Sequence, residues 1–420
     1  MIDRPKGGEQ AVLVHIDFPD EGMQEDQAEF EELARSAGAN IVGVVTGTRH
    51  APEPKYFIGT GKAEEIREYV KAHNAELVLF NHQLAPAQER NLERFLECRV
   101  LDRTGLILDI FAQRARSFEG KLQVELALLK HMATRLVRGW THLERQGGGI
   151  GLRGPGETQL ETDRRLIRGR IKLISQRIIK VRKQRDLSRR ARQKAVIPTV
   201  AIVGYTNAGK STLFNSLCGT DVFAANQLFA TLDPTLRKLE VPDLGSVILA
   251  DTVGFIRHLP HDLVDAFRAT LEEVCAANLL IHVVDVHDSR MQENISEVNE
   301  VLESIGAGEI PQIIVFNKID LCPHLSPHVE TIQGENITRV WVSAHKKQGL
   351  DELKACVSHI LGQDLVQKTL VLQPKDARLR AVLYGKKAVI SETIDETGNC
   401  RIIVRLSPAD LEKFFSEFLE

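Results

Sequence analysis

The chain has 420 residues, of which 43% are hydrophobic and 26% charged, a balance typical of globular proteins rather than of disordered chains. The formal net charge is −3, no uninterrupted apolar run exceeds four residues, and the N-terminus lacks an apolar segment, which argues against a transmembrane helix and a secretory signal. The six cysteines form no C-x-x-C pair, which argues against a zinc site or a disulfide framework and favours buried thiols in a reducing cytoplasm.

Short apolar runs alternate with helical patterns along residues 11–101. This alternation predicts a parallel α/β sheet in an N-terminal domain of residues 1–117. Strands are expected at 11–16, 40–46 and 76–80, and helices at 26–37, 61–73 and 86–97.

Residues 104–137 carry apolar side chains at helical spacing and are expected to form one continuous helix. Six glycines then crowd residues 147–156, which predicts a loop. Residues 163–194 contain fourteen Lys or Arg and two acidic residues, a net charge of +12, beside an apolar stripe at helical spacing. We expect this basic helix to pair with residues 119–137 in an antiparallel helical hairpin.

The hairpin is expected to span residues 118–197 and to contact a polyanion through its basic face, the alternative being a solvated helix face. The candidate contacts are Arg153, Arg164, Arg165, Arg168, Lys172 and Lys183.

A second α/β unit is predicted for residues 198–362, because strands and helices alternate again after Pro198. The expected strands are 199–203, 246–250, 279–285, 312–316 and 339–343. Residues 363–420 are expected to form a small α/β domain without a chemical motif. The predicted fold class is therefore α/β, with the second unit doubly wound.

The first strand of the second unit runs into a loop with the pattern G-x-x-x-x-G-K-[ST], and a helix follows. Backbone amides of such a loop can surround phosphates, and the helix N-terminus adds its positive dipole end. Lys210 would reach the β- and γ-phosphate oxygens, and Ser211 would offer its hydroxyl to Mg²⁺. The loop comprises Gly204, Tyr205, Thr206, Asn207, Ala208, Gly209, Lys210, Ser211 and Thr212.

Two further segments are placed to meet the γ-phosphate and its metal ion. Asp251 would bind Mg²⁺ through water, and the amide of Gly254 would contact the γ-phosphate. Thr231 is a candidate second hydroxyl ligand on a segment that would order around the γ-phosphate, with Thr235 as its rival. The segments are Phe229, Ala230, Thr231, Leu232 and Asp233, and Asp251, Thr252, Val253 and Gly254.

Base recognition is assigned to the segment after the strand at 312–316. The carboxylate of Asp320 can accept hydrogen bonds from the N1–H and 2-amino groups of guanine, whereas adenine would leave it facing a lone pair. A backbone amide after the next strand could bind the guanine O6. The residues concerned are Asn317, Lys318, Ile319 and Asp320, and Ser343, Ala344 and His345.

Together these motifs resemble the HflX family of translation-factor-class GTPases. The resemblance rests on residues 56–62 (YFIGTGK), residues 154–161 (GPGETQLE), and the strings GYTNAGKST, LFATLDPT, DTVGFI and NKID. It implies a cytoplasmic, Mg²⁺-dependent GTPase, expected to be monomeric, that binds GTP and GDP, with Lys210, Thr231 and Gly254 in catalysis. It also implies binding to the large ribosomal subunit, splitting of stalled or idle ribosomes or a role in ribosome biogenesis, and contact of the N-terminal domain and hairpin with ribosomal RNA.

The residue after Gly254 is Phe255, where many GTPases place a glutamine that orients the attacking water. Phenylalanine cannot hydrogen-bond water, so either another group supplies catalysis or the free enzyme is slow. GTPases with asparagine at the position of Asn207 often bind K⁺ beside the phosphates, so K⁺ is a second candidate ion. The alternative for Asn207 is a plain turn residue.

Two other functions are compatible with the motifs. One is a switch whose GTP state recruits a protein partner, which leaves the basic helix unexplained. The other is an RNA-remodelling factor with an additional ATP site in the N-terminal domain. The segment ending in Gly61-Lys62 has Tyr56 in place of the first glycine of a phosphate loop and Ala63 in place of the hydroxyl, so it predicts a turn.

Overall fold

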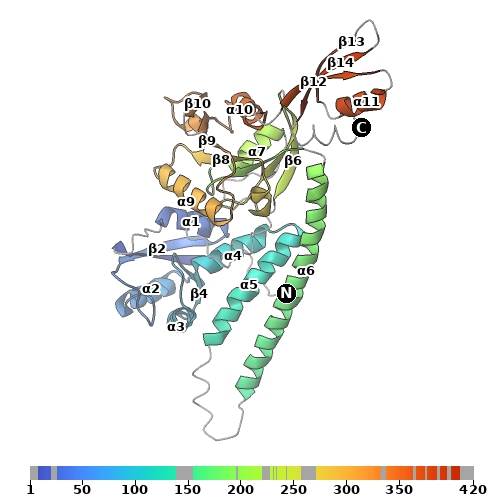
Figure 1. The fold of residues 1–420 in the computed structure, drawn as a ribbon. Coiled ribbons are helices and arrows are strands. Elements are labelled where there is room, and N and C mark those ends of the chain that lie inside the picture. The colour runs from blue at the N-terminus through green and yellow to red at the C-terminus, as the bar shows by residue number, and fades with distance from the viewer. Residues whose placement is uncertain are drawn as a thin grey trace. The chain divides into compact units, whose positions relative to one another are not determined.

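The structure, a computed structural model (Figure 1), divides into two compact units that are each discontinuous in sequence. The first unit is Met1–Asp186, Phe223–Pro234 and Thr252–Glu272, and the second is Leu187–Val222, Thr235–Asp251 and Glu273–Glu420. The residues described are 8–19, 26–138, 155–194, 197–219, 228–229, 231–232, 234–242, 244–256, 271–332, 337–362, 366–373, 376–385, 388–394 and 399–406.

A parallel four-stranded sheet of order β2-β1-β3-β4 forms the centre of the first unit, which confirms the predicted sheet type. The strand β4 was not expected, because it is four residues long and begins and ends with a charged side chain. The strands are β1 (Gln10–Asp17), β2 (Asn40–Thr48), β3 (Leu77–Phe80) and β4 (Arg99–Asp102).

Four helices alternate with these strands, as βαβ connections require. Helices α2 and α3 share one hydrophobic core with the sheet, in which Ile66 and Leu92 pack near Val78 and Phe80. The helices are α1 (Gln27–Ser36), α2 (Thr60–Ala72), α3 (Pro86–Leu96) and α4 (Arg103–Arg114).

The expectation of one continuous helix over 104–137 is wrong. Helix α4 ends at Arg114, and α5 (Phe118–Arg138) begins after a break. Ala115 has an extended backbone, with ψ of 111°, and the hydroxyl of Ser117 accepts a hydrogen bond from the amide of Gly120 at 2.9 Å. A serine that satisfies a first-turn amide starts a new helix. Apolar spacing runs through the break, so periodicity alone did not reveal it.

Helix α5 packs against α6 (Pro155–Lys194), as the sequence predicted. Leu122 of α5 shares a small core with Ile174 and Ile178, and Arg170 forms an ion pair with Glu125 at 2.6 Å. Leu122 contacts residues 174 and 178 of α6, whereas Glu125, later in α5, pairs with Arg170, which is earlier in α6. The two helices of the hairpin therefore run antiparallel (Figure 1). The expected glycine loop falls mainly within 139–154, outside the described residues.

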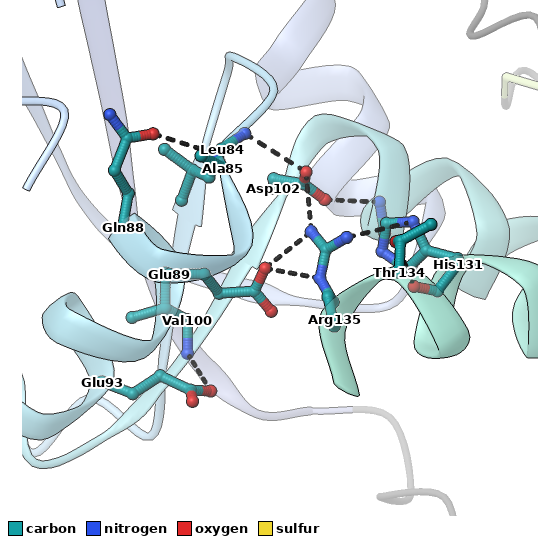
Figure 2. Close-up of polar contacts among 11 residues, drawn as sticks. Leu84, Ala85, Gln88, Glu89, Glu93, Val100, Asp102, His131, Thr134 and Arg135 are labelled. Atoms are coloured by element: carbon teal, nitrogen blue, oxygen red, sulfur yellow. Dashed lines mark hydrogen bonds and ion pairs between the residues drawn. The ribbon is translucent and has the colours of Figure 1, made fainter. Parts of the chain in front are cut away.

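A partly buried ionic network links the C-terminal part of α5 to α3 and to strand β4 of the N-terminal sheet (Figure 2). Arg135 donates to Glu89 of α3 at 2.6 Å and to Asp102 at 2.9 Å, and also to the ring nitrogen of His131 at 3.2 Å. Asp102 is fully buried and also accepts from the amide of Gly105 at the start of α4. Burial raises the pKa of Glu89 to about 7, although the charge of Arg135 opposes that shift. One arginine therefore pairs with carboxylates from two elements, α3 and β4.

The second unit is built on a sheet of order β10-β11-β9-β8-β5-β7-β6, in which the outer strands β6 and β10 run antiparallel to their neighbours. The five expected strands are present within about two residues, and β6 and β10 were not expected. The strands are β5 (Thr199–Val203), β6 (Thr235–Val241), β7 (Gly245–Asp251), β8 (Leu279–Asp285), β9 (Gln312–Asn317), β10 (His328–Ile332) and β11 (Ile337–Trp341).

The helices of the second unit pack against this sheet, and α7 and α10 contribute Leu213, Phe214 and Leu353 to its main core. The helices are α7 (Lys210–Cys218), α9 (Met291–Ser304) and α10 (Leu350–Gly362), with a short 3₁₀ turn η2 (Ile319–Leu321). The phosphate-loop pattern thus lies between the central strand β5 and α7, as the sequence predicted.

The C-terminal segment forms a three-stranded antiparallel sheet of order β12-β14-β13, which confirms a small α/β fold. Its core includes Leu383 of α11 and Ile402 of β14. The elements are β12 (Val366–Leu372), α11 (Ala377–Gly385), β13 (Val389–Ile394) and β14 (Cys400–Leu406).

The six cysteines are free thiols, as expected, but the expectation that all are buried is wrong. Cys400 is buried, Cys275 is exposed, and the remaining four are half-buried. Among the helices that the structure describes, none combines the length and apolar character needed to cross a membrane.

Candidate functional site

Two glycines of the phosphate-loop pattern occupy positions that exclude any side chain. Gly204 has φ of 142°, and a Cβ there would lie 2.2 Å from the carbonyl oxygen of Val283 in β8. Gly209 has φ of 92°, and a Cβ there would lie 2.2 Å from the side-chain nitrogen of Asn317. Strands β8 and β9 therefore lie directly against the loop backbone at these two positions. Only glycine allows the backbone to come this close.

Lys210 follows Gly209 at the first position of α7, and its side chain is buried. The ammonium group donates to the carbonyl oxygen of Tyr205 within the loop at 2.6 Å. Burial lowers the pKa of Lys210 to about 8, the nearby charge of Asp251 raises it, and that of Lys318 lowers it further. A phosphate group beside the loop would favour the protonated, charge-carrying form.

A hydroxyl and a carboxylate meet beside Lys210. The hydroxyl of Ser211 donates to the carboxylate of Asp251 at 2.8 Å, and Asp251, at the end of β7, is fully buried. Hard oxygen donors of this kind suit Mg²⁺, which takes few protein ligands and completes its shell with phosphate oxygens and water. Among the described residues, no group of three or more His, Cys, Asp or Glu could hold a metal alone. Ser211 and Asp251 supply two oxygen donors, which fit a Mg²⁺ ion that takes its other ligands from phosphate and water.

The residues predicted to recognise the base lie at the same edge of the sheet and are linked to the phosphate loop. The side chain of Asn317 donates to the carbonyl oxygen of Ala208 and accepts from the amide of Ala344, both at 3.0 Å. The hydroxyl of Ser343 donates to the carboxylate of Asp320 at 2.6 Å, which orients that carboxylate. These hydrogen bonds bring Asn317, Asp320 and Ser343 together with the phosphate loop, and His345 of the same segment is exposed.

The remaining predicted residues belong to the first unit. Thr231 is half-buried there, and Phe229, Leu232 and the segment 252–255 are buried. Ala230 and Asp233 lie outside the described residues, as does the segment after residue 256.

Two residues that the sequence did not indicate, Ser36 and Phe111, contact residues 228 and 229, just before Thr231. The amide of Leu228 donates to the hydroxyl of Ser36, the last residue of α1, at 3.1 Å. The rings of Phe111 and Phe229 meet edge to face with centroids 4.6 Å apart. No local pattern marks Ser36 or Phe111, because their partners lie far along the chain.

The basic face of α6 is displayed to solvent. Four of its predicted contact residues are exposed and Arg164 is half-buried, whereas Arg153 lies outside the described residues. The exposed four are Arg165, Arg168, Lys172 and Lys183.

Family models match three successive stretches of the chain. They are described as GTP-binding GTPase N-terminal over residues 24–112, GTP-binding GTPase Middle Region over 114–192, and 50S ribosome-binding GTPase over 199–318. The third stretch contains the phosphate loop, Asp251 and Asn317, so fold, local geometry and family model agree on one class. The protein is a P-loop GTPase, an enzyme that binds and hydrolyses GTP.

Curated relatives narrow this class to one family. "GTPase HflX" of Escherichia coli strain K12 is 58% identical over 98% of this chain and 96% of its own length. The protein of the same name from Caldanaerobacter subterraneus is 48% identical over 95% of this chain and 91% of its own, and that from Magnetococcus marinus is 41% identical over 99% and 97%. The chain belongs to the HflX family of GTPases.

Proposed function

We propose that this GTPase binds the large ribosomal subunit and hydrolyses GTP there to split stalled or idle ribosomes, or acts on the subunit during its biogenesis. The basic, solvent-exposed face of α6 carries this proposal, since a polyanion such as ribosomal RNA is the partner that its charge fits. The description of the matching family model as a 50S ribosome-binding GTPase is consistent with it. Such a partner implies a cytoplasmic protein, which we expect to act as a monomer.

We assign catalysis to Lys210, Thr231 and Gly254, and Mg²⁺ binding to Ser211, Thr231 and, through water, Asp251. When bound, Mg²⁺ would neutralise charge on the β- and γ-phosphate oxygens. Lys210 would donate to the same oxygens from within the buried loop, where its charge is poorly screened. The proposed nucleotide contacts are residues 204–212, 229–233, 251–254, 317–320 and 343–345.

Potassium is a second proposed ion, assigned to Asn207. Its backbone is left-handed, with φ of 59°, in a turn of the phosphate loop. A monovalent cation there would add positive charge beside the phosphates, which is the role that an arginine finger fills in other GTPases.

We also propose four domains, with boundaries at 1–117, 118–197, 198–362 and 363–420. The break between α4 and α5 and the end of α6 support the first two boundaries. The start of β12 at Val366 supports the last.

Two alternatives are less well supported. A switch that only recruits a protein partner leaves the basic face of α6 without a role. An ATP site in the N-terminal domain would need a phosphate loop near residues 56–63, but Tyr56 is buried in the core there and Lys62 forms an ion pair with Glu65 at 2.8 Å.

Ribosome binding through α6 is expected to depend strongly on salt. Charge reversal of Arg165, Arg168, Lys172 and Lys183 to glutamate should reduce the slope of log affinity against log salt by about three, because each lost phosphate contact removes about 0.7–0.9 from it. Co-sedimentation with large subunits over a range of KCl concentrations measures the slope.

The matched control reverses exposed basic residues of the C-terminal domain, Lys368, Arg378 and Arg401. Its slope should equal that of the unmodified protein. If the α6 variant also kept the unmodified slope, α6 would be a solvated spacer.

The free enzyme is expected to be slow, because Phe255, in the position that often holds the water-orienting glutamine, is buried and cannot hydrogen-bond water. Docking on the large subunit would order the segments around Thr231 and Gly254 and complete the site by induced fit. We expect large subunits to stimulate single-turnover hydrolysis by about 10³-fold or more. Small subunits are the control, and equal rates with and without large subunits would contradict the proposed function.

A further inference from the structure

An ion pair outside the recognised motifs lies at the base-recognition segment. The ammonium group of Lys318 is 2.7 Å from the carboxylate of Asp285, the last residue of β8. Both side chains are largely shielded from solvent, with exposed fractions of 26% and 21%. A pair this short and this shielded is screened less than an ordinary surface ion pair.

The backbone holds both partners in place. Asp285 is the register partner of Asn317 across β8 and β9, and its other carboxylate oxygen accepts from the amide of His287 at 3.0 Å. The amide of Val286 donates to the carbonyl oxygen of Asn317 at 3.1 Å. Lys318 has a left-handed backbone, with φ of 68°, which is unfavourable for lysine and persists only where neighbouring contacts impose it.

Lys318 occupies a central position in the site. Asn317 on one side touches the phosphate loop through Ala208, and Asp320 on the other is the proposed guanine-recognising carboxylate. The aliphatic stem of Lys318 therefore starts between the residue that contacts the phosphate loop and the residue that selects the base. A stem held at a fixed angle there offers an apolar surface to a nucleotide, whereas a mobile lysine would have to be ordered on binding.

We propose that Asp285 is a positioning residue for guanine-nucleotide binding, and that it acts by holding the ammonium group of Lys318 so that the lysine stem is preorganised beside the nucleotide. The proposal rests on the assignment of residues 317–320 to base recognition. It also predicts that removing the Asp285 carboxylate changes nucleotide affinity in the direction opposite to the one that net charge alone would produce. Removing an acidic group near an anionic nucleotide should tighten binding by charge alone, whereas loss of the positioning contact should weaken it.

The test measures the equilibrium affinity and dissociation rate of a fluorescent GDP derivative, with the full chain and no ribosomes. Asp285→Asn should weaken binding by about tenfold, mostly through faster dissociation, as expected for loss of a charge-assisted contact. Lys318→Met keeps an apolar stem and removes the charge, and it should weaken binding similarly. The double variant that combines Asp285→Asn and Lys318→Met should bind GDP no more weakly than Lys318→Met alone, because the two residues act as one unit.

The control is Asp288→Asn in the same loop. Asp288 carries the same charge but accepts from the amide of Arg290 and the side chain of Asn294. It should leave GDP affinity unchanged or slightly tighter, and melting temperatures compare the folding of all the variants.

Three results would overturn the proposal: unchanged or tighter binding in Asp285→Asn, additive losses in the double variant, or an equal loss in Asp288→Asn. Normal GDP binding by Lys318→Met alongside weakened binding by Asp285→Asn would also overturn it, because Asp285 would then act without Lys318. Asp285→Glu is the conservative variant, and it should bind more tightly than Asp285→Asn.

Discussion

Lys210→Ala is expected to reduce GTP hydrolysis by about 10³-fold, the upper range for removing one preorganised charge that faces a transition state. The lysine is buried and already directed into the phosphate loop, so its charge would act on the phosphates with little screening by solvent. Single-turnover hydrolysis in the presence of saturating large subunits is the appropriate measurement, since the free enzyme is expected to be slow.

Lys62→Ala is the matched control, because Lys62 follows Gly61 in the incomplete N-terminal pattern and pairs with Glu65. It should retain normal turnover. Normal turnover in Lys210→Ala would instead show that the phosphate loop is misassigned.

Asp320→Asn is expected to exchange guanine preference for xanthine preference, with a change in relative affinity of about 10⁴-fold, as for buried hydrogen-bond mismatches. The amide NH₂ of asparagine can donate to the 2-oxo group of xanthine but meets the 2-amino group of guanine as a second donor. Ser343 now donates to the carboxylate of Asp320, and it can still donate to the amide oxygen of the substituted asparagine, so the side chain should remain oriented.

Competition between GTP and XTP for the binding site measures this exchange. An adenine nucleotide serves as the control and should bind poorly to both forms. Unchanged GTP affinity in Asp320→Asn would remove the basis for assigning residues 317–320 to the base.

The candidate nucleotide site could be proposed from the sequence because its chemistry is local in sequence. A strand, a glycine-rich loop and a lysine at the start of α7 form the phosphate site within a dozen residues, and the packing of Gly204 against β8 explains why the pattern needs glycine. Residues 317–320 and 343–345 lie at the ends of the parallel neighbours β9 and β11, so their side chains gather at one edge of the sheet by topology alone.

The features that escaped prediction depend on distant partners or on short signals. Strand β4 is four residues long, and the break before α5 rests on the backbone of Ala115 and the hydroxyl of Ser117. The arginine that joins α5 to the sheet resembles any other charged residue of a helix until Glu89 and Asp102 are placed beside it. Periodicity reports which face of a helix is apolar, but not which distant residue meets it.

The contact between Ser36 and Leu228 has a consequence for how the protein folds while it is being synthesised. The two residues are 192 positions apart, and at about 5–20 residues per second the hydroxyl of Ser36 is made roughly 10–40 s before its partner. Phe111 is likewise synthesised well before Phe229, the aromatic residue that its ring contacts. The first unit therefore cannot finish packing when its own N-terminal sheet has been made, and its surface for residues 228–229 stays open until the first segment of the second unit, Leu187–Val222, has been synthesised.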